Sequence, residues 1–200
     1  MIFAVLATDE QWNEITKGIT EVIWLRVDSF NAIPANADAI FVLKEGLMLD
    51  YSITEKIIFI NAVCITLKEL NAPLNVVRIN GWNGFLLRPN WEIAGCMQEK
   101  IKLIFAALNK QFTVVPDEPG FIAARILAMI INEAWFALGE AISTKAEINI
   151  AMKLGTNYPY GPFEWSEIIG EKNIFTLLQK LSTTNKRYLP AALLQQKISK

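Results

Sequence analysis

The chain has 200 residues, 52% of them hydrophobic, with 19 basic and 20 acidic side chains and a formal net charge of −1. This length suits one large domain or two small ones. The near-neutral charge gives no electrostatic footprint for nucleic acid or for an anionic membrane surface. Histidine is absent from the whole sequence, which removes the side chain most often used as a general base near neutral pH.

The two cysteines, Cys64 and Cys96, do not form a CxxC pair, so we expect free thiols in a reducing, cytoplasmic setting. The chain does not open with a basic segment followed by an apolar one, so no secretory signal is expected. The longest uncharged apolar stretch, residues 57–67, is too short to span a bilayer. The sequence also shows no cluster of metal-ligating residues, so we expect no metal site.

The first half of the chain alternates short apolar runs with polar connections. It predicts five strands and two helices. The strands are expected at residues 2–6, 22–25, 39–43, 56–60 and 76–79, and the helices at 11–17, ending at Gly18, and around 66–70. Continuous apolar runs of this length are typical of strands buried on both faces of a parallel sheet. The pattern therefore predicts an α/β, Rossmann-like domain with a parallel sheet over residues 1–115.

The second half shows only helical periods, so residues 116–200 are predicted to form an all-α domain. Asp117 and Glu118 precede Pro119, an arrangement that favours a helix N-terminus at this point. The segment that follows, residues 121–138, is apolar around most of its circumference. Such a helix must be buried in a core or against a second subunit, and we expect a homodimer built on the C-terminal helices.

A second dense stretch begins with Thr144-Lys145-Ala146-Glu147, which is a capping box for a helix. Gly155 is predicted to stop that helix. The loop Asn157-Tyr158-Pro159-Tyr160-Gly161-Pro162 combines prolines that restrict the backbone with a glycine that permits unusual dihedrals. We expect this loop to form a rigid corner before the next helix.

Two motifs in this half resemble the C-terminal helical domain of the 3-hydroxyacyl-CoA dehydrogenases. They are Pro119-Gly120-Phe121-Ile122-Ala123-Ala124-Arg125 and the stretch from Ala151 to Trp165. The resemblance implies an all-α domain of the 6-phosphogluconate/3-hydroxyacyl-CoA dehydrogenase type behind the Rossmann-like domain. It also implies NAD-dependent oxidation of a 3-hydroxyacyl-CoA in fatty acid or acyl-CoA metabolism, with acyl-CoA as a ligand.

The resemblance places a GxGxxG turn after the first strand, where glycines let the backbone approach the pyrophosphate of the cofactor at a helix N-terminus. This chain has Ala7-Thr8-Asp9-Glu10 there instead. We therefore expect Thr8 or Asp9 to cap the helix, and NAD not to bind tightly. The acidic residue that would bind the ribose falls at Arg26 or Asp28, depending on the register of the second strand.

Members of the family carry a catalytic His in a Gly-x-His-Phe-Phe-Asn-Pro stretch and, twelve positions later, a Glu that orients it. Aligning Gly81-Trp82-Asn83 with the start of that motif puts Asn83 at the His and Gly95 at the Glu. Asparagine has no titratable nitrogen and glycine has no carboxylate, so neither can take part in the proton transfer. Glu92 is the nearest acid, but in this alignment it falls three positions early.

Two further family positions also differ. The Asn of the motif Pro-Gly-Phe-x-x-Asn-Arg is Ala124 here, and a Ser that follows the fourth strand falls near Val63. Cys64 lies beside Val63, but no histidine exists to activate it as a nucleophile.

With the base, the orienting acid and the phosphate-binding turn all absent, the sequence favours a member of this family that has lost catalysis and acts as a binding or assembly subunit. Two alternatives stay open. One is an active NAD-dependent dehydrogenase with an atypical site, for example one completed by a partner chain. The other is a structural partner that dimerises with an active relative.

Overall fold

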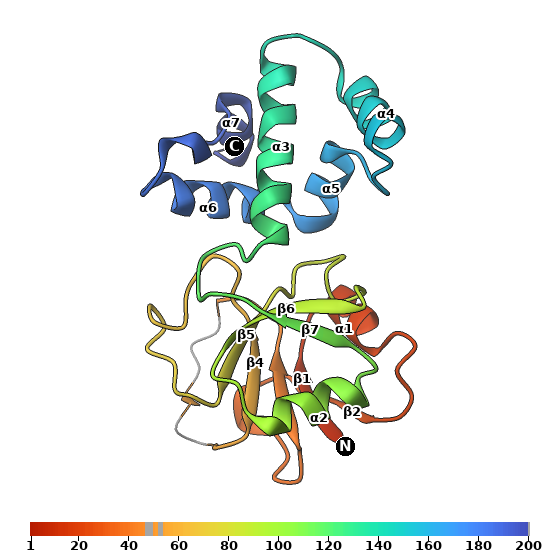
Figure 1. The fold of residues 1–200 in the computed structure, drawn as a ribbon, viewed down its shortest axis with the longest axis vertical. Helices are drawn as coiled ribbons and strands as arrows, with labels where there is room; N and C mark the ends of the chain where they lie inside the picture. Colours follow the sequence, from red (N-terminus) through yellow and green to blue (C-terminus); the bar gives the residue numbers. More distant parts are fainter. Residues whose placement is uncertain (47–49, 52–53, 200) are drawn as a thin grey trace. The chain divides into compact units, whose positions relative to one another are not determined.

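The computed structural model describes residues 1–46, 50–51 and 54–199. It divides the chain into two compact units, Met1–Phe121 and Ile122–Lys200 (Figure 1). The division falls later in the chain than the boundary predicted at residue 115. Every described strand lies in the first unit, and the described elements of the second unit are all helical.

The first unit is built on a seven-stranded sheet with the order β2-β1-β3-β4-β5-β6-β7. Its strands are β1 (Ile2–Leu6), β2 (Ile23–Arg26), β3 (Ala39–Val42), β4 (Ile57–Asn61), β5 (Val76–Ile79), β6 (Asn90–Gly95) and β7 (Gln111–Val114). Neighbours are parallel except β5 and β6, which are antiparallel. The five predicted strands are confirmed. The pattern misses β6 and β7 because exposed and half-exposed residues interrupt their apolar positions.

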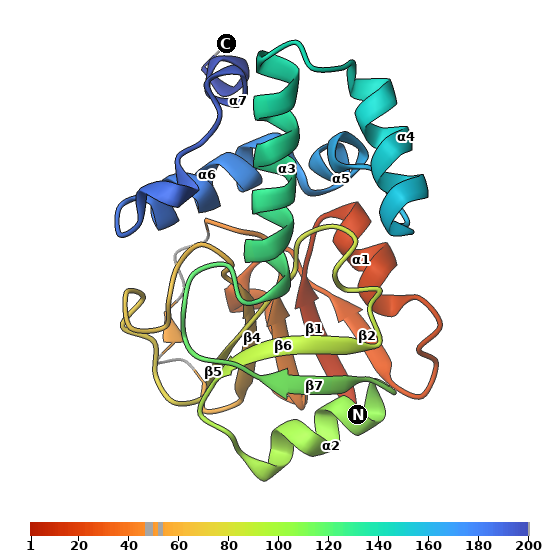
Figure 2. The same cartoon turned by 45° about the horizontal axis from the view of Figure 1, so that its top comes forward.

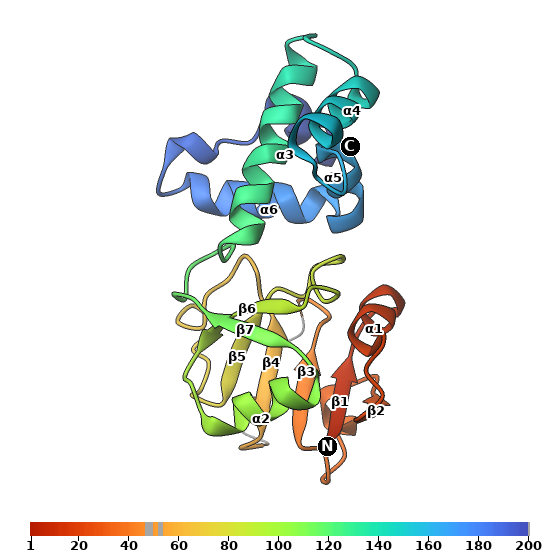
Figure 3. The same ribbon diagram turned by 45° about the vertical axis from the view of Figure 1, so that its right-hand side comes forward.

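The two faces of the sheet are covered differently. Side chains alternate along each strand, so Phe41 and Phe59 point to one face while Ile40 and Ile58 point to the other. Helices α1 (Asp9–Thr16) and α2 (Glu99–Ala107) cover the first face (Figure 3). The second face is covered by the 3-10 helix η1 (Phe30–Ala32) and by non-helical segments such as residues 62–72.

The helix predicted around residues 66–70 is wrong, because that segment forms turns. The Glu69 carboxylate accepts hydrogen bonds from the backbone and hydroxyl of Thr66, as at the start of a helix. Asn71 then takes a left-handed conformation with φ 47°, which closes the segment after a single turn.

The second unit packs its helices around α3 (Ala123–Gly139), the long helix in Figure 2. Three helices lie against α3: α5 (Pro162–Ile169), α6 (Glu171–Ser182) and α7 (Ala192–Ile198). Helix α4 (Lys145–Thr156) packs on α5, and the 3-10 helix η3 (Lys186–Tyr188) packs on α6. Trp135 and Phe163 make an edge-to-face contact between α3 and α5, with ring centroids 5.2 Å apart. The all-α prediction for this part is confirmed.

The start of the long helix differs from the prediction. Helix α3 begins at Ala123 rather than at Pro119, because Gly120 (φ 86°) and Phe121 (φ 50°) are both left-handed. The Asp117 carboxylate does not cap this helix. It accepts hydrogen bonds from the amides of Leu67 and Lys68.

The corner between α4 and α5 also forms for reasons other than those predicted. The Thr144–Glu147 capping box is present. Gly155 does not stop the helix, because Asn157, at φ 54°, is the left-handed residue that ends it. Gly161 has an ordinary φ of −74°. It must be glycine for space, since a Cβ there would lie 2.5 Å from the Cα of Asn149.

Candidate functional site

The carboxyl ends of β1, β3, β4 and β5 lie along one edge of the parallel part of the sheet, which we call the carboxyl edge. The chain order reverses here, because β2 lies on one side of β1 and β3 lies on the other. Ligands of open α/β sheets bind outside the carboxyl ends of the strands at such a reversal. The residues that follow these strands therefore form the candidate functional site.

The turn after β1 is closed by its own side chains. The Thr8 hydroxyl accepts from the Gln11 amide at 3.2 Å, and the Gln11 carboxamide oxygen accepts from the Thr8 amide at 3.1 Å. The Asp9 carboxylate is 2.6 Å from the guanidinium of Arg26, which also donates to the Ala7 carbonyl. Thr8 thus caps α1, which is one of the two alternatives, Thr8 or Asp9, that the sequence predicts. The positive end of α1 is already supplied with a side-chain acceptor and two carboxylates, Asp9 and Glu10.

Gln11 and Asn61 fill the space between the strand ends. The Gln11 carboxamide, 6% exposed, donates to the Leu43 carbonyl at 2.9 Å and to the Gly81 carbonyl at 3.0 Å. Asn61 donates to the same Leu43 carbonyl at 3.0 Å and accepts from the Gly81 amide at 2.9 Å. These four bonds join the ends of β3, β4 and β5 through protein groups alone. The sequence signal for them is the polar residue Asn61 ending a fully apolar strand.

The end of β5 meets β6 across the antiparallel pair. Val77 lies opposite Gly95, and Ile79 lies opposite Ile93. Continuing that register by one residue sets Asn80 opposite Glu92. Asn83 follows in a turn and has no ladder partner among the described residues. The structure therefore does not bring Asn83 and Gly95 together as an opposed pair.

Asn80 is buried, with 7% of its surface exposed. Its carboxamide oxygen accepts from the Trp82 amide at 3.2 Å. Its Nδ2 is buried and has no hydrogen-bond partner among the described residues. A buried donor of this kind costs about 1–3 kcal/mol when left unpaired, so it is available to an acceptor from a ligand or from water.

Glu14 on α1 holds the loop that follows Asn80. Its Oε1 accepts from the Gly84 amide at 2.6 Å, while its Oε2 is buried without a partner among the described residues. Burial raises the pKa of this carboxyl, and the hydrogen bond from the Gly84 amide opposes the rise. Gly84 has φ 86°, a conformation that favours glycine. The loop that carries Asn83 is thus anchored to the helix that starts after β1.

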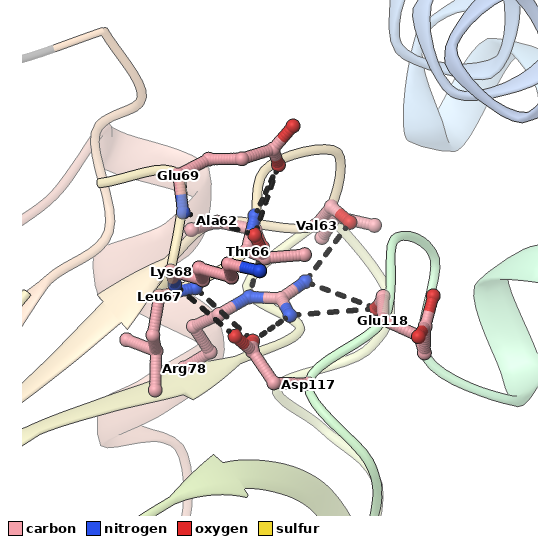
Figure 4. Close-up of polar contacts among 9 residues, drawn as sticks. All are labelled: Ala62, Val63, Thr66, Leu67, Lys68, Glu69, Arg78, Asp117 and Glu118. Atoms are coloured by element: carbon pink, nitrogen blue, oxygen red, sulfur yellow. Dashed lines mark hydrogen bonds and ion pairs between the residues drawn. The ribbon is translucent and has the colours of Figure 1, made fainter. Parts of the chain in front are cut away.

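Arg78 in β5 ties the carboxyl edge to the segment that leads out of the first unit (Figure 4). Its side chain is 0% exposed and pairs with Asp117. Its Nε donates to the Ala62 carbonyl at 2.8 Å, and its terminal nitrogens reach the carbonyls of Val63 and Glu118. Burial lowers the pKa of Arg78, and the hydrogen bond to Asp117 opposes that effect.

The same cluster fixes the strained turn before α3. The Gly120 amide donates to the Val63 carbonyl at 2.7 Å, and the guanidinium of Arg78 lies 4.7 Å from the centre of the Phe121 ring. Phe121 is 4% exposed despite its positive φ. Burial of its ring against Arg78 offsets the backbone strain, which is of order 1–3 kcal/mol for such a residue.

The described part of the chain has neither a metal-binding cluster nor a membrane-spanning helix. No group of three His, Cys, Asp or Glu side chains there could hold a metal ion. No helix within the same residues is both long and apolar enough to cross a bilayer.

The second unit is similar in sequence to a known protein domain. Residues 120–200 match the family model of the C-terminal domain of 3-hydroxyacyl-CoA dehydrogenase. The second unit is therefore similar to the C-terminal domain of the 3-hydroxyacyl-CoA dehydrogenases. It is 42% identical over 91 residues to the 3-hydroxyadipyl-CoA dehydrogenase of Escherichia coli K12, and 39% identical over 98 residues to a 3-hydroxybutyryl-CoA dehydrogenase of Bradyrhizobium diazoefficiens. These matches span 44% and 48% of this chain but only 19% and 33% of the relatives.

Solved structures share the fold of this chain. Mycobacterium tuberculosis FadB2 superposes with a TM-score of 0.77 at 14% identity, over 99% of this chain and 93% of that one. The (S)-3-hydroxybutyryl-CoA dehydrogenase of Ralstonia eutropha gives 0.68 at 23% identity, over 88% and 70% of the two chains. The Rossmann-like sheet followed by a helical domain is therefore the architecture of this chain.

The remaining family positions lie in different surroundings. Val63 is fully buried, and its carbonyl is used by Arg78 and Gly120. Ala124 is fully buried in the first turn of α3. Asp28 is exposed beyond the end of β2, whereas Arg26 ends that strand. Cys64 is half-buried and Cys96 is exposed.

Proposed function

We propose that this chain is a 3-hydroxyacyl-CoA dehydrogenase family protein that has lost catalysis and acts as an acyl-CoA-binding or assembly subunit. The β5–β6 register carries the proposal. It supports an Asn80–Glu92 pair at the twelve-residue spacing that the resemblance assigns to the catalytic His and its orienting Glu. On this assignment Asn80, rather than Asn83, stands at the position of the base. Glu92, rather than Gly95, then keeps the carboxylate.

An asparagine at the position of the base can bind but cannot catalyse proton transfer. Its amide donates a hydrogen bond to a carbonyl oxygen, yet it neither takes nor releases a proton near neutral pH. The unpaired Nδ2 of Asn80 supports a donor of this kind, directed at the acyl carbonyl of the ligand. The absence of histidine from the whole chain supports the same reading.

The first unit does not fit a dinucleotide cofactor. The pyrophosphate site of such a fold lies at the N-terminus of the helix after β1 and uses glycines for close approach. Here that N-terminus carries Asp9 and Glu10 and is capped by Thr8, and Gln11 spans the strand ends beside it. These features support a protein that does not hold NAD tightly.

Calorimetry with separate ligands tests the proposal. We expect acetoacetyl-CoA to bind and NADH to show no dissociation constant in the micromolar range or below. Turnover of acetoacetyl-CoA with NADH would instead support the atypical dehydrogenase. If neither ligand binds but the chain co-purifies with an active co-expressed relative, the structural-partner alternative would replace it.

A further inference from the structure

A cavity at the opposite edge of the sheet, away from the carboxyl edge, has the composition of a small-molecule site. It measures about 320 Å³ and lies under the connection between β2 and β3, on the face that η1 covers. Pockets for small ligands range from roughly 300 to 1,000 Å³ and are lined mainly by apolar groups with a few polar ones. Phe30, Ile33 and Ile40 supply the apolar lining, and Thr54 and Lys56 supply polar groups.

Lys56 is the charged group of this cavity. Its ammonium donates to the carbonyls of Pro34 and Ala35, which also line the cavity. Among the described residues no carboxylate forms an ion pair with Lys56, and no acidic side chain lines the cavity. An ammonium has three donors and these two carbonyls accept from two of them, so one donor is left for a ligand beside the apolar lining.

The segment that carries Lys56 is held in place. The Asn75 carboxamide donates to the Thr54 carbonyl at 3.1 Å and to the Lys56 carbonyl at 2.8 Å. The Thr54 hydroxyl accepts from the Lys56 amide at 3.1 Å. Strand β4 starts at the next residue, Ile57, which pairs with Ala39 of β3. The lysine is therefore ordered before any ligand arrives, which lowers the entropic cost of binding.

We propose that this cavity binds a medium-chain monocarboxylate, with the alkyl chain against Phe30, Ile33 and Ile40 and the carboxylate on Lys56. A charge-assisted hydrogen bond to the ammonium would fix the head group, and burial of the chain would supply the hydrophobic part of the affinity. A thioester carries no carboxylate at this point, so the site selects a free acid over an acyl-CoA. The proposal is independent of acyl-CoA binding at the carboxyl edge.

The test is a titration with octanoate. Binding is measured by calorimetry and by the NMR signals of the isoleucine methyl groups. We expect binding to shift the methyl signals of Ile33 and Ile40. Lys56→Met is expected to weaken binding roughly tenfold or more, Lys56→Arg to retain it, and Lys100→Met, a matched change on the exposed face of α2, to leave it unchanged. Octylamine is expected not to compete.

A second variant tests the cavity independently, in case Lys56→Met fails to fold. Ala35→Trp, at an exposed position of the lining, should fill the cavity and abolish binding while the far-ultraviolet circular dichroism stays the same. The proposal falls if octanoate does not bind to the wild-type chain, if Lys56→Met binds it equally well, or if octylamine competes. It also falls if the shifted signals lie outside this cavity.

Discussion

At the scale of single residues, the proposed assignment of Asn80 and Glu92 to the family's catalytic positions depends on the register of one strand pair. The alignment on Gly81-Trp82-Asn83 is reasonable in sequence, because it matches a glycine. That alignment gives the pair Asn83 and Gly95 and leaves Glu92 without a role, whereas the pair proposed above lies three positions earlier. The antiparallel ladder instead opposes Gly95 to Val77 and brings Glu92 to the end of β5.

We expect the pKa of a histidine introduced at Asn80 to report this register. Asn80→His would introduce the single histidine of the chain, and a facing carboxylate favours the charged imidazole. Adding Glu92→Gln should therefore lower the pKa of the introduced imidazole, measured by NMR titration. In the matched variant Asn83→His, the pKa should not respond to Glu92→Gln. The opposite pattern would favour Asn83 as the family position.

Arg78 makes a second residue-scale prediction. Arg78→Met removes the cation from a fully buried side chain and leaves Asp117 and three carbonyls without it. Breaking a buried pair in this way costs about 3–5 kcal/mol, to be measured by urea unfolding. Arg26→Met, which removes the more exposed pair with Asp9, should cost about 1 kcal/mol or less. Equal losses would mean that the Arg78 cluster does not stabilise the first unit.

At the scale of elements, Gly155 and Gly161 both lie in or against α4 but differ in the space around them. Gly161 is packed against Asn149, whereas Gly155 lies in α4 with open space where a Cβ would stand. Both positions have backbone conformations that alanine can adopt, so space decides the outcome at Gly161 and helix propensity decides it at Gly155.

We therefore expect alanine to act in opposite directions at the two positions. Gly161→Ala should lower the free energy of unfolding by about 1–3 kcal/mol through overpacking. Gly155→Ala should raise it by about 0.5–1 kcal/mol, because alanine favours a helix interior over glycine. Thermal and urea unfolding of the two variants check this. Destabilisation by Gly155→Ala would indicate that the glycine does end the helix.

At the scale of the whole molecule, the helical unit leaves apolar side chains uncovered. On α3 and the residue before it, Ile122, Ile126 and Phe136 are 52%, 56% and 38% exposed. Helix α4 buries none of its residues, and Leu154 on it is 82% exposed. Apolar surface of this kind is typical of a protein–protein interface.

We propose that these helices form a homodimer, as the composition of residues 121–138 predicts. An obligate interface would bury on the order of 2,000 Å² or more. Light scattering should report twice the chain mass at micromolar concentration, and Ile126→Glu together with Leu154→Glu should give a monomer that stays helical. A wild-type chain that is already monomeric would contradict the proposal.

The local pattern was sufficient for the five parallel strands, for a cap at Thr8 or Asp9, for the capping box at Thr144, and for the family resemblance of the second unit. Each of these is encoded by residues close together in sequence, through burial on both faces of a strand or through a side chain that satisfies an amide three residues away. The absence of a histidine base is likewise a property of composition alone.

Tertiary structure decided what depends on partners distant in sequence. The sequence predicts Asp117 at a helix N-terminus, but in the structure it pairs with Arg78, 39 residues away. The sequence also predicts Phe121 to be helical, but its ring packs on the same guanidinium and its φ is positive. The β5–β6 register, continued by one residue, sets Asn80 opposite Glu92, and Gln11 closes the carboxyl edge through contacts 32 and 70 residues away. Local propensity is worth at most about 1 kcal/mol per residue. Breaking a buried ion pair or leaving a buried amide unpaired costs more than this, so those long-range contacts set the geometry of the site.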